Sequence, residues 1–332
     1  MHVKLNNPTP FSALNFQSVD AKRNHFGVVV VRGAFKIENE KRLILLDKQE
    51  PLVLEDSYFG DRGKSSVRFG HSLAPYKPKT DVLIEATAYS PSGKPQTDWI
   101  SEVHLGDRTK RFRVTGPRNW ENGITGRKVS APHPISKLDI RYEHAFGGIS
   151  ADGKTTFPEN PLGVGFDNTP GAKFPQIVPA EFELRDNGRV PVVGLGPIGP
   201  GWQPRLGFAG TFDAKWKDEA APYLPDDFDF EHYNVASPGM RITNFVEGDE
   251  VIGLRNLYSK GDLSFGLPGI QYSNILRFKD GRIVPGPMNL DTIEIQVEQQ
   301  LAFLQWRGIF QATLPIIQVD LRISAPEFLI AA

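Results

Sequence analysis

The sequence contains no cysteine in its 332 residues. This absence excludes disulfide bonds, zinc–thiolate sites, iron–sulfur clusters and a cysteine nucleophile. Long apolar runs are missing as well, because the run at 28–31 is far below the ~20 residues that span a bilayer. The first residues lack the basic region and apolar stretch of a signal peptide. We therefore expect a soluble protein of the cytoplasm that does not insert into a membrane.

An excess of one charge is also missing. The formal net charge of −1 at pH 7 gives the chain no overall attraction to nucleic acid or to an anionic membrane. Lys and Arg do predominate in residues 1–120, where they number 19 against 13 Asp and Glu, and the remainder has the opposite bias. This asymmetry would suit a polarised surface for a partner, and it would suit equally well the docking of two lobes of the chain. No stripe of basic and aromatic residues indicates a nucleic-acid partner.

Long helical patterns are scarce, because 32 glycines and 27 prolines interrupt the chain. Short runs of β-branched and aromatic residues between turn residues are common instead, and they predict strands. We expect residues 82–115 to form an antiparallel meander and 292–297 to form a hairpin with 301–310. The expected strands lie at 26–37, 42–46, 82–89, 99–105, 110–115, 138–146, 250–258, 262–267, 273–284, 290–297, 301–311 and 316–323.

These patterns predict a mainly β fold of antiparallel sheets, packed like a sandwich and accompanied by few short helices. We expect an N-terminal antiparallel β region at 1–125 and a C-terminal antiparallel β region at 241–332. An irregular middle rich in Gly and Pro, at 126–240, would join them. The whole of 1–332 is expected to form one unit.

The middle centres on residues 196–235, which are rich in Gly, Pro, Trp, Asp and Phe. Loops of this length inside a compact domain are usually functional or disordered. Eight aromatic residues between positions 202 and 233 carry too much apolar surface for disorder, so we expect an ordered irregular segment. The only helix of substance is expected at 226–234, with Asp226 or Asp227 capping its start.

Two glycine motifs resemble phosphate-binding loops but lack the required context. GLGPIG at 194–199 has the spacing of a dinucleotide-binding loop, yet Pro197 and Pro200 prevent the helix that must begin there. GDRGKS at 60–65 ends like a P-loop but is too short, since Tyr58 stands where the first glycine is needed. The seven histidines show none of the spacings of metal ligands, and no serine lies in a GxSxG motif. We therefore expect no metal, no cofactor and no enzymatic activity.

Five of the seven acidic residues between 213 and 231 leave more than one interpretation open. They could bind a cation such as calcium at 226–231, although the spacing lacks the alternating ligands and central glycine of a calcium loop. They could also serve a carbohydrate-binding or glycoside-processing protein, with Trp202 and Trp216 lining a sugar groove. We favour a third interpretation, in which the acids stabilise the start of a helix and the tryptophans anchor irregular backbone. The acids are Asp213, Asp226, Asp227, Asp229 and Glu231.

A series of short motifs runs along nearly the whole chain. In this order they resemble the family catalogued as domain of unknown function 2169, whose genes lie in type VI secretion clusters beside effectors. The motifs are GVVVVRGAFK (27–36), QEP (49–51), DSYFG (56–60), LAPYKPKTDV (73–82), AYSPSG (88–93), VTGPRNW (114–120), YEHAFGG (142–148), NPLG (160–163), WQPR (202–205), GTFDAKW (210–216), LPDDFDFEHYN (224–234), LDT (290–292) and WRG (306–308).

The resemblance implies an adaptor or chaperone without catalytic activity. Its partners would be a toxic effector protein and a component of the secretion spike, either the valine-glycine repeat protein or its tip. A stable structural component of the secretion particle is a further alternative. Binding would rest on aromatic and Arg anchors or on an open sheet edge. We expect that most of the following motif positions hold the irregular middle together and that some face a partner: Arg118, Trp120, Trp202, Arg205, Asp213, Trp216, Asp227 and Phe228.

Overall fold

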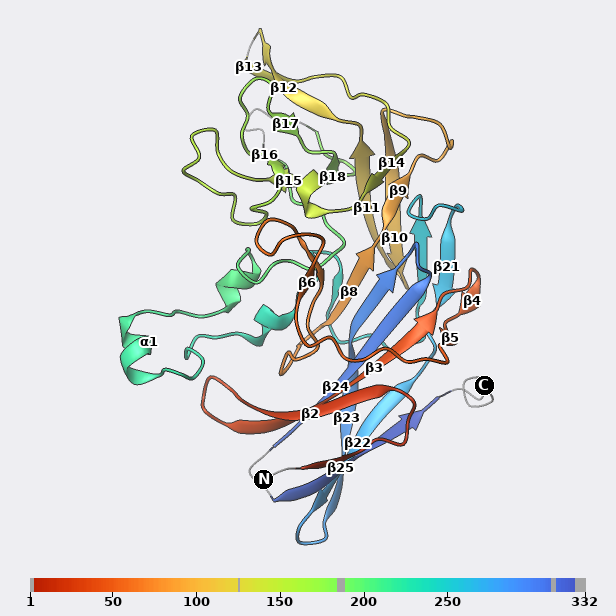
Figure 1. Ribbon diagram of the computed structural model, residues 1–332, viewed down its shortest axis with the longest axis vertical. Coiled ribbons are helices and arrows are strands. Elements are labelled where there is room, and N and C mark those ends of the chain that lie inside the picture. Colours follow the sequence, from red (N-terminus) through yellow and green to blue (C-terminus); the bar gives the residue numbers. More distant parts are fainter. Residues whose placement is uncertain (1–2, 125, 184–188, 312–314, 326–332) are drawn as a thin grey trace.

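The computed structural model describes every residue except 1–2, 125, 184–188, 312–314 and 326–332. The mainly β fold predicted from the sequence is confirmed (Figure 1). Within the described residues the only α-helix is α1 (Ala214–Glu219), and three 3₁₀ helices accompany it: η1 (Tyr142–His144), η2 (Arg205–Phe208) and η3 (Phe230–Tyr233). No helix in the described part of the chain is long and apolar enough to cross a membrane.

The larger sheet contains ten strands drawn from both ends of the chain. Strand β8 (Thr80–Glu85) runs parallel to β23 (Ile283–Gln296). Strand β19 (Arg241–Ile242) pairs with β8, and β5 (Ile44–Leu45) pairs with β3 (His25–Lys36). The sheet curls, so that Asn15 of one end strand donates to the carbonyl oxygen of Val3, beside the other end strand, at 2.9 Å. The main order is β1 (Lys4–Asn6), β25 (Ile316–Ser324), β22 (Gln271–Phe278), β23 (Ile283–Gln296), β24 (Leu301–Gln311), β3 (His25–Lys36) and β2 (Ser12–Val19).

Strand β3 has the composition that its position requires. It lies between β2 and β24, and residues 27–35 include the β-branched run 28–31. Residues 28–35 of β3 are buried, side chains on both faces included. A strand covered on both faces reads as a continuous apolar run, in contrast to the alternation of a half-exposed strand. Such a run therefore predicts a central strand.

A six-stranded sheet covers the first sheet and shares its core, which gives the expected sandwich-like packing. Phe112, Ile252 and Phe265 of this sheet belong to the same buried cluster as Ile293 and Trp306 of the larger one. The order of the strands is β18 (Ile177–Pro179), β11 (Arg108–Thr115), β10 (Asp98–Leu105), β20 (Val251–Arg255), β21 (Leu263–Gly266) and β4 (Lys41–Arg42).

Short strand pairs form the end of the molecule drawn at the top of Figure 1. They enclose a second, smaller core that consists of Trp120, Phe146, Phe157, Phe174, Val178 and Val190. The strands are β12 (Arg118–Gly123) with β13 (Gly126–Val129) and β17 (Lys173–Phe174), β15 (Phe146–Gly147) with β16 (Val164–Gly165), and β14 (Lys137–Asp139) with β9 (Thr87–Tyr89). A further pair, β6 (Ser57–Tyr58) with β7 (Val67–Phe69), lies beside the larger sheet.

The meander predicted for 82–115 is wrong in its first half. Strands β10 and β11 do form an antiparallel hairpin, but β8 pairs in parallel with β23 and antiparallel with β19. Residues 80–84 are all buried, which requires partners on both sides in the centre of a sheet. Strand β9 then leaves that sheet and pairs with β14.

The strand predicted at 138–146 is also wrong beyond Asp139. The chain turns through η1, and the side-chain amide of Asn160 donates to the carbonyl oxygens of Tyr142 and Phe146 at 2.8 and 3.0 Å. These bonds satisfy carbonyls that a strand would have paired with a neighbour. The predicted strand 273–284 likewise spans a turn at 279–282, between β22 and β23.

Candidate functional site

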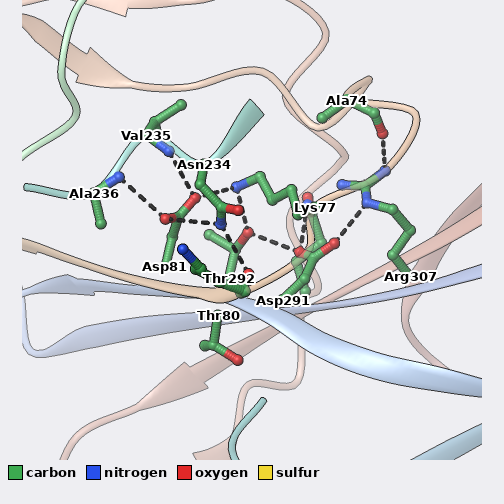
Figure 2. A network of polar contacts seen from close by, with 12 residues as sticks. Ala74, Lys77, Thr80, Asp81, Asn234, Val235, Ala236, Asp291, Thr292 and Arg307 are labelled. Carbon is green, nitrogen blue, oxygen red and sulfur yellow. Dashed lines mark hydrogen bonds and ion pairs between the residues drawn. The ribbon is translucent and has the colours of Figure 1, made fainter. Parts of the chain in front are cut away.

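A buried polar network fastens the irregular middle to the larger sheet (Figure 2). Asp81, on β8, is fully buried and accepts a bond from the ammonium group of Lys77 at 2.8 Å. It also accepts from the backbone N–H groups of Val235 and Ala236 at 2.9 and 3.1 Å and from the side chain of Asn234 at 3.2 Å. One carboxylate thus fixes residues 234–236 against the sheet.

A second buried carboxylate, Asp291 on β23, continues the network. It accepts from Nε of Arg307 at 2.6 Å and from the hydroxyl group of Thr292 at 2.8 Å. The same hydroxyl group accepts from Lys77 at 2.8 Å, so Thr292 joins the two ion pairs. Arg307 also donates to the carbonyl oxygens of Ser72 and Ala74. Lys77 and Arg307 are each about 5% exposed or less, which identifies the network as a scaffold beneath the surface.

Two short helices, η2 and η3, lie next to this scaffold. Arg205 of η2 donates to the carbonyl oxygen of His232 in η3 at 2.7 Å and to that of Ile198 at 2.8 Å. His232 Nδ1 lies 3.0 Å from the carbonyl oxygen of Arg205. A carbonyl oxygen only accepts, so Nδ1 carries the proton. Burial lowers the pKa of Arg205, and nearby Asp56 and Asp81 act against this shift. Burial likewise lowers the pKa of His232.

Aromatic packing and an ion pair anchor the two helices to the sheet. The ring of Phe230 meets Tyr76 at 5.6 Å, Phe26 of β3 at 6.2 Å and Phe228 at 5.5 Å. Lys79, which precedes β8, pairs with Glu231 at 2.5 Å. The base formed by η2 and η3 is therefore held both by apolar contacts and by charge.

Residues 209–228, here called the arm, extend from this base. Figure 1 shows the arm, with α1, projecting away from both sheets. Its two ends are joined because Asp227 accepts from the backbone N–H and the hydroxyl group of Thr211 at 2.9 and 2.7 Å. Gly210 permits this closure: its φ is +79°, and a Cβ atom there would lie 2.8 Å from Asp227.

The tip of the arm has its own internal order. Asp213 accepts from the backbone N–H of Trp216 at 2.8 Å and so caps α1. The indole N–H of Trp216 donates to the carbonyl oxygen of Tyr223 at 2.9 Å, and its ring packs edge-on against Phe212 at 4.7 Å. These contacts make the arm an ordered element, as expected from the sequence.

The outer surface of the arm exposes large apolar side chains. Phe212 is 57% exposed and Tyr223 is 42% exposed, and Leu206 in the base is 48% exposed. The tip contacts the rest of the protein through Arg23, which lies in the turn between β2 and β3. Its guanidinium donates to the carbonyl oxygen of Glu219 at 3.0 Å and lies over the ring of Tyr223 at 5.6 Å.

The motif positions singled out in the sequence fall into three places. Asp213, Trp216, Asp227 and Phe228 build the arm and its junction with the base, and Arg205 holds the base. Trp202 lies nearby and packs edge-on against Tyr142 at 5.3 Å.

Arg118 and Trp120 lie in the smaller core instead. The indole N–H of Trp120 donates to the carbonyl oxygen of Gly165 at 3.3 Å. The guanidinium of Arg118 lies over the ring of Phe174 at 4.7 Å, and burial lowers its pKa. These two residues connect β12 with the segments around Gly165 and Phe174.

Residues 22–307 match the family described as "Uncharacterized protein conserved in bacteria (DUF2169)". The chain belongs to this family. No curated protein and no solved structure matches it.

In this DUF2169 member, four of the five acids singled out between 213 and 231 have a partner within the fold, namely Asp213, Asp227, Asp229 and Glu231. Asp213 caps α1, Asp229 caps η3 by accepting from the backbone N–H of Glu231 at 2.8 Å, and Glu231 pairs with Lys79. The helix predicted at 226–234 is wrong except for its last turn, because Asp227 bonds across the arm to Thr211 and does not start a helix. Across the described ranges, no group of three His, Asp or Glu side chains lies close enough to hold a metal ion.

Sequence reasoning missed the buried network as a site of the DUF2169 chain. Lys77, Asp81, Asp291 and Arg307 all lie in motifs that carry the family resemblance, but no single motif contains both ion pairs. The four-residue spacing of Lys77 and Asp81 was the available signal. The pairing of Asp291 with Arg307 depends on the register of β23 and β24, which the sequence leaves open.

Proposed function

We propose that this chain is an adaptor that binds an effector protein in the bacterial cytoplasm and helps to load it onto the type VI secretion spike. The family resemblance suggests this role, and one observation carries it: an ordered arm presents Phe212 and Tyr223 to solvent. Exposed aromatic side chains held in a fixed geometry are typical of residues that anchor a protein partner.

Rigidity is the feature that favours binding over incidental exposure. The Asp227–Thr211 bonds, the Asp213 cap and the Trp216–Tyr223 bond order the arm before any partner arrives. An ordered element loses less conformational entropy on binding, so more of the contact energy contributes to affinity. The scaffold of Asp81 and Asp291 would serve this role by keeping the base of the arm in place.

The charge of the arm specifies the partner further. Residues 209–228 carry five acidic side chains and two lysines, all exposed, for a net charge of −3. A complementary surface would hold an apolar pocket for Phe212 or Tyr223 with Lys and Arg around its rim. We expect the effector, or its linker to the spike, to present such a surface.

Co-purification tests the proposal. The tagged chain is expressed with each protein encoded beside its gene, and complexes are sized by light scattering. We expect one neighbour to form a stoichiometric complex. The double variant Phe212→Ser/Tyr223→Ser should weaken that complex at least tenfold, because it removes both aromatic anchors.

A matched control uses exposed apolar residues far from the arm. Ile283→Ser/Val284→Ser changes side chains that are 57% and 41% exposed, at the start of β23. This variant should bind like the unaltered protein. Complex formation that is equally strong in both double variants would remove the arm from the proposal, and a monomer that binds no neighbour would overturn the adaptor function itself.

A further inference from the structure

Arg118 carries a guanidinium group that has no polar partner. The residue begins β12, and its guanidinium lies over the ring of Phe174 at 4.7 Å. Its side chain makes no hydrogen bond and no ion pair with any residue that the structure describes, and its Nε atom is buried without a partner. A charged group that is partly removed from water normally has a partner, because its desolvation is costly. Arg118 therefore departs from the usual environment of such a group.

The same arrangement occurs elsewhere in the protein with a carboxylate added. Among the described side chains, five other guanidinium groups lie over phenylalanine rings, and each of them also pairs with an Asp or a Glu. In these cases the ring covers one face of the guanidinium, and the carboxylate receives its N–H groups. Arg118 has the ring and lacks the carboxylate. The five pairs are Arg32 with Glu294 at 3.7 Å, Arg68 with Glu85 at 2.9 Å, Arg141 with Asp139 at 3.3 Å, Arg189 with Glu159 at 2.7 Å and Arg282 with Asp280 at 2.7 Å.

The outer end of the Arg118 side chain is free while its inner end is held. The ring of Phe174 and the burial of Nε fix the orientation of the guanidinium. Of its three nitrogen atoms only Nε is enclosed, so Nη1 and Nη2 reach the surface. The parallel N–H groups of a guanidinium match the two oxygens of a carboxylate. The geometry therefore suits a carboxylate that approaches Nη1 and Nη2 from outside the chain.

The surrounding charges also favour an anion. Burial lowers the pKa of Arg118, Asp98 acts against this shift, and Arg113 of β11 adds to it through its like charge. Arg113 donates to the carbonyl oxygen of Ala180 at 2.9 Å and, in the described part of the chain, has no ion pair either. Asp98 is exposed and lies beyond ion-pair distance of both arginines. A further carboxylate would therefore reduce the repulsion between the two guanidinium groups.

We propose that Arg118 is a docking point for the carboxylate of an Asp or Glu side chain on the bound protein. The inference rests on the proposed function, since it names a second contact with the same partner. Figure 1 places β12 away from α1, so a partner that contacts both would span the arm and the smaller core. Its acidic side chain would take the position that Asp or Glu takes beside the other five stacked arginines.

A titration of the full chain tests the site without the natural partner. The probes are a short capped oligoglutamate and the matching oligoglutamine, and the readout is the Nε–H signal of each arginine in nuclear magnetic resonance spectra. Arg118→Lys identifies the Arg118 signal by its loss. We expect oligoglutamate to shift this signal saturably and to leave that of Arg282 in place, because Arg282 already pairs with Asp280. Oligoglutamine should shift neither signal.

Two matched variants test the contact in the complex with a neighbouring gene product. Arg118→Gln should weaken that complex about tenfold, as for the loss of one charge-assisted hydrogen bond. Arg282→Gln should leave the affinity unchanged, although Arg282 also lies over a ring, that of Phe278 at 5.0 Å, because its carboxylate belongs to the chain itself.

Asp98 is the carboxylate within the chain that could compete for Arg118. We expect Asp98→Asn to change the affinity for oligoglutamate by less than about twofold, because the exposed carboxylate is screened by solvent. A rise of about tenfold or more would show that Asp98 already occupies the guanidinium, and it would overturn the inference.

Other outcomes separate the inference from the adaptor function. An Arg118 signal that oligoglutamate does not move would overturn the inference whether or not a neighbour binds, and a larger shift with inorganic phosphate would identify a phosphate site instead. If Arg118→Gln binds the neighbour as the unaltered protein does, the docking role is wrong and the adaptor function stands. If the unaltered protein binds no neighbour, the adaptor function fails and the docking role fails with it, even where the titration reveals a carboxylate site.

Discussion

Single buried charges have the largest influence on this molecule at the scale of the residue. Asp81 is fully buried, so water cannot replace the four hydrogen bonds that it accepts. Loss of one member of a buried ion pair leaves the other member uncompensated, which costs more than the pair contributes. The position also joins a strand to the segment that carries the base of the arm, so its effect extends beyond the local contact.

We predict that Asp81→Ala lowers the free energy of unfolding by about 3–5 kcal/mol, because Lys77 and two backbone N–H groups lose their acceptor. Urea unfolding followed by tryptophan fluorescence measures the change. Asp61→Ala is the matched control, since that carboxylate is 78% exposed and lies 3.6 Å from Lys64. It should change stability by less than about 0.5 kcal/mol. Equal effects of the two substitutions would refute the role of Asp81.

The free energy of unfolding is expected to depend on pH through three histidines. Burial lowers the pKa of His71, His144 and His232 below the ordinary value of 6.5. Between the folded and unfolded pKa values the unfolded chain binds more protons, so stability rises with pH in that window. We therefore predict that the contribution of these histidines to stability is complete above about pH 6.5 and is lost progressively as pH falls below it.

Urea unfolding at several pH values between 7.5 and 5.0 tests this dependence. His232→Asn should make the slope shallower, whereas the same substitution at exposed His133 should not. A free energy of unfolding that stays constant over this range would contradict the prediction.

The contacts that could not be predicted from the sequence share one physical property: the two residues of each contact are far apart in the chain. They meet through strand register and not through spacing. Phe230, for example, meets Phe26 and Tyr76 only because η3 lies on the face of β3. Capping by Asp213 acts within three residues, so its signal is present in the sequence, whereas the bond of Asp227 to Thr211 joins residues sixteen positions apart.

At the scale of the element, local composition predicted strands well and pairing poorly. The apolar run of β3 and the hairpin of β23 with β24 follow from residue preference and short connections. The parallel pairing of β8 with β23 does not follow from local composition, because parallel strands are joined by long connections and the residues of one strand do not specify its partner. The arm is the opposite case, because almost all of its order comes from contacts within residues 209–228.

Because most contacts that order the arm lie within the arm itself, we predict that Trp216→Ala has a local effect. The variant loses the ring contact with Phe212 and the bond to the carbonyl oxygen of Tyr223. Backbone amides of residues 209–228 should exchange hydrogen at least tenfold faster, as measured by mass spectrometry. The free energy of global unfolding should change by less than about 1 kcal/mol, because the arm adds no residue to the main core described for the chain. A cooperative loss of protection throughout the protein would show that the arm is part of the global fold.

At the scale of the whole molecule, the ten-stranded sheet unites the beginning and the end of the chain. Strand β3 lies beside β24, β1 beside β25, and β8 beside β23. The main core contains residues from 11 to 321 and lies between both sheets. Neither β-rich end can complete a sheet of its own.

We predict that residues 241–332 expressed alone do not fold, because β23 and β24 would lack β8 and β3 as neighbours. The fragment should show poorly dispersed amide resonances in nuclear magnetic resonance spectra. The complete chain should unfold in one transition, with tryptophan fluorescence and circular dichroism giving the same midpoint. Two separate midpoints would contradict this prediction.

The pairing of β3 with β24 has a consequence during synthesis on the ribosome. The apolar strand from His25 to Lys36 emerges early, but its partner, which begins at Leu301, is among the last segments to be translated. At ~5–20 residues per second, the edge of the strand that does not face β2 waits roughly 15–60 s before it can pair with β24. A nascent chain with this exposed run is open to aggregation throughout that interval. Slow translation of the middle of the chain would lengthen the interval, and a holding chaperone at the ribosome exit would protect it.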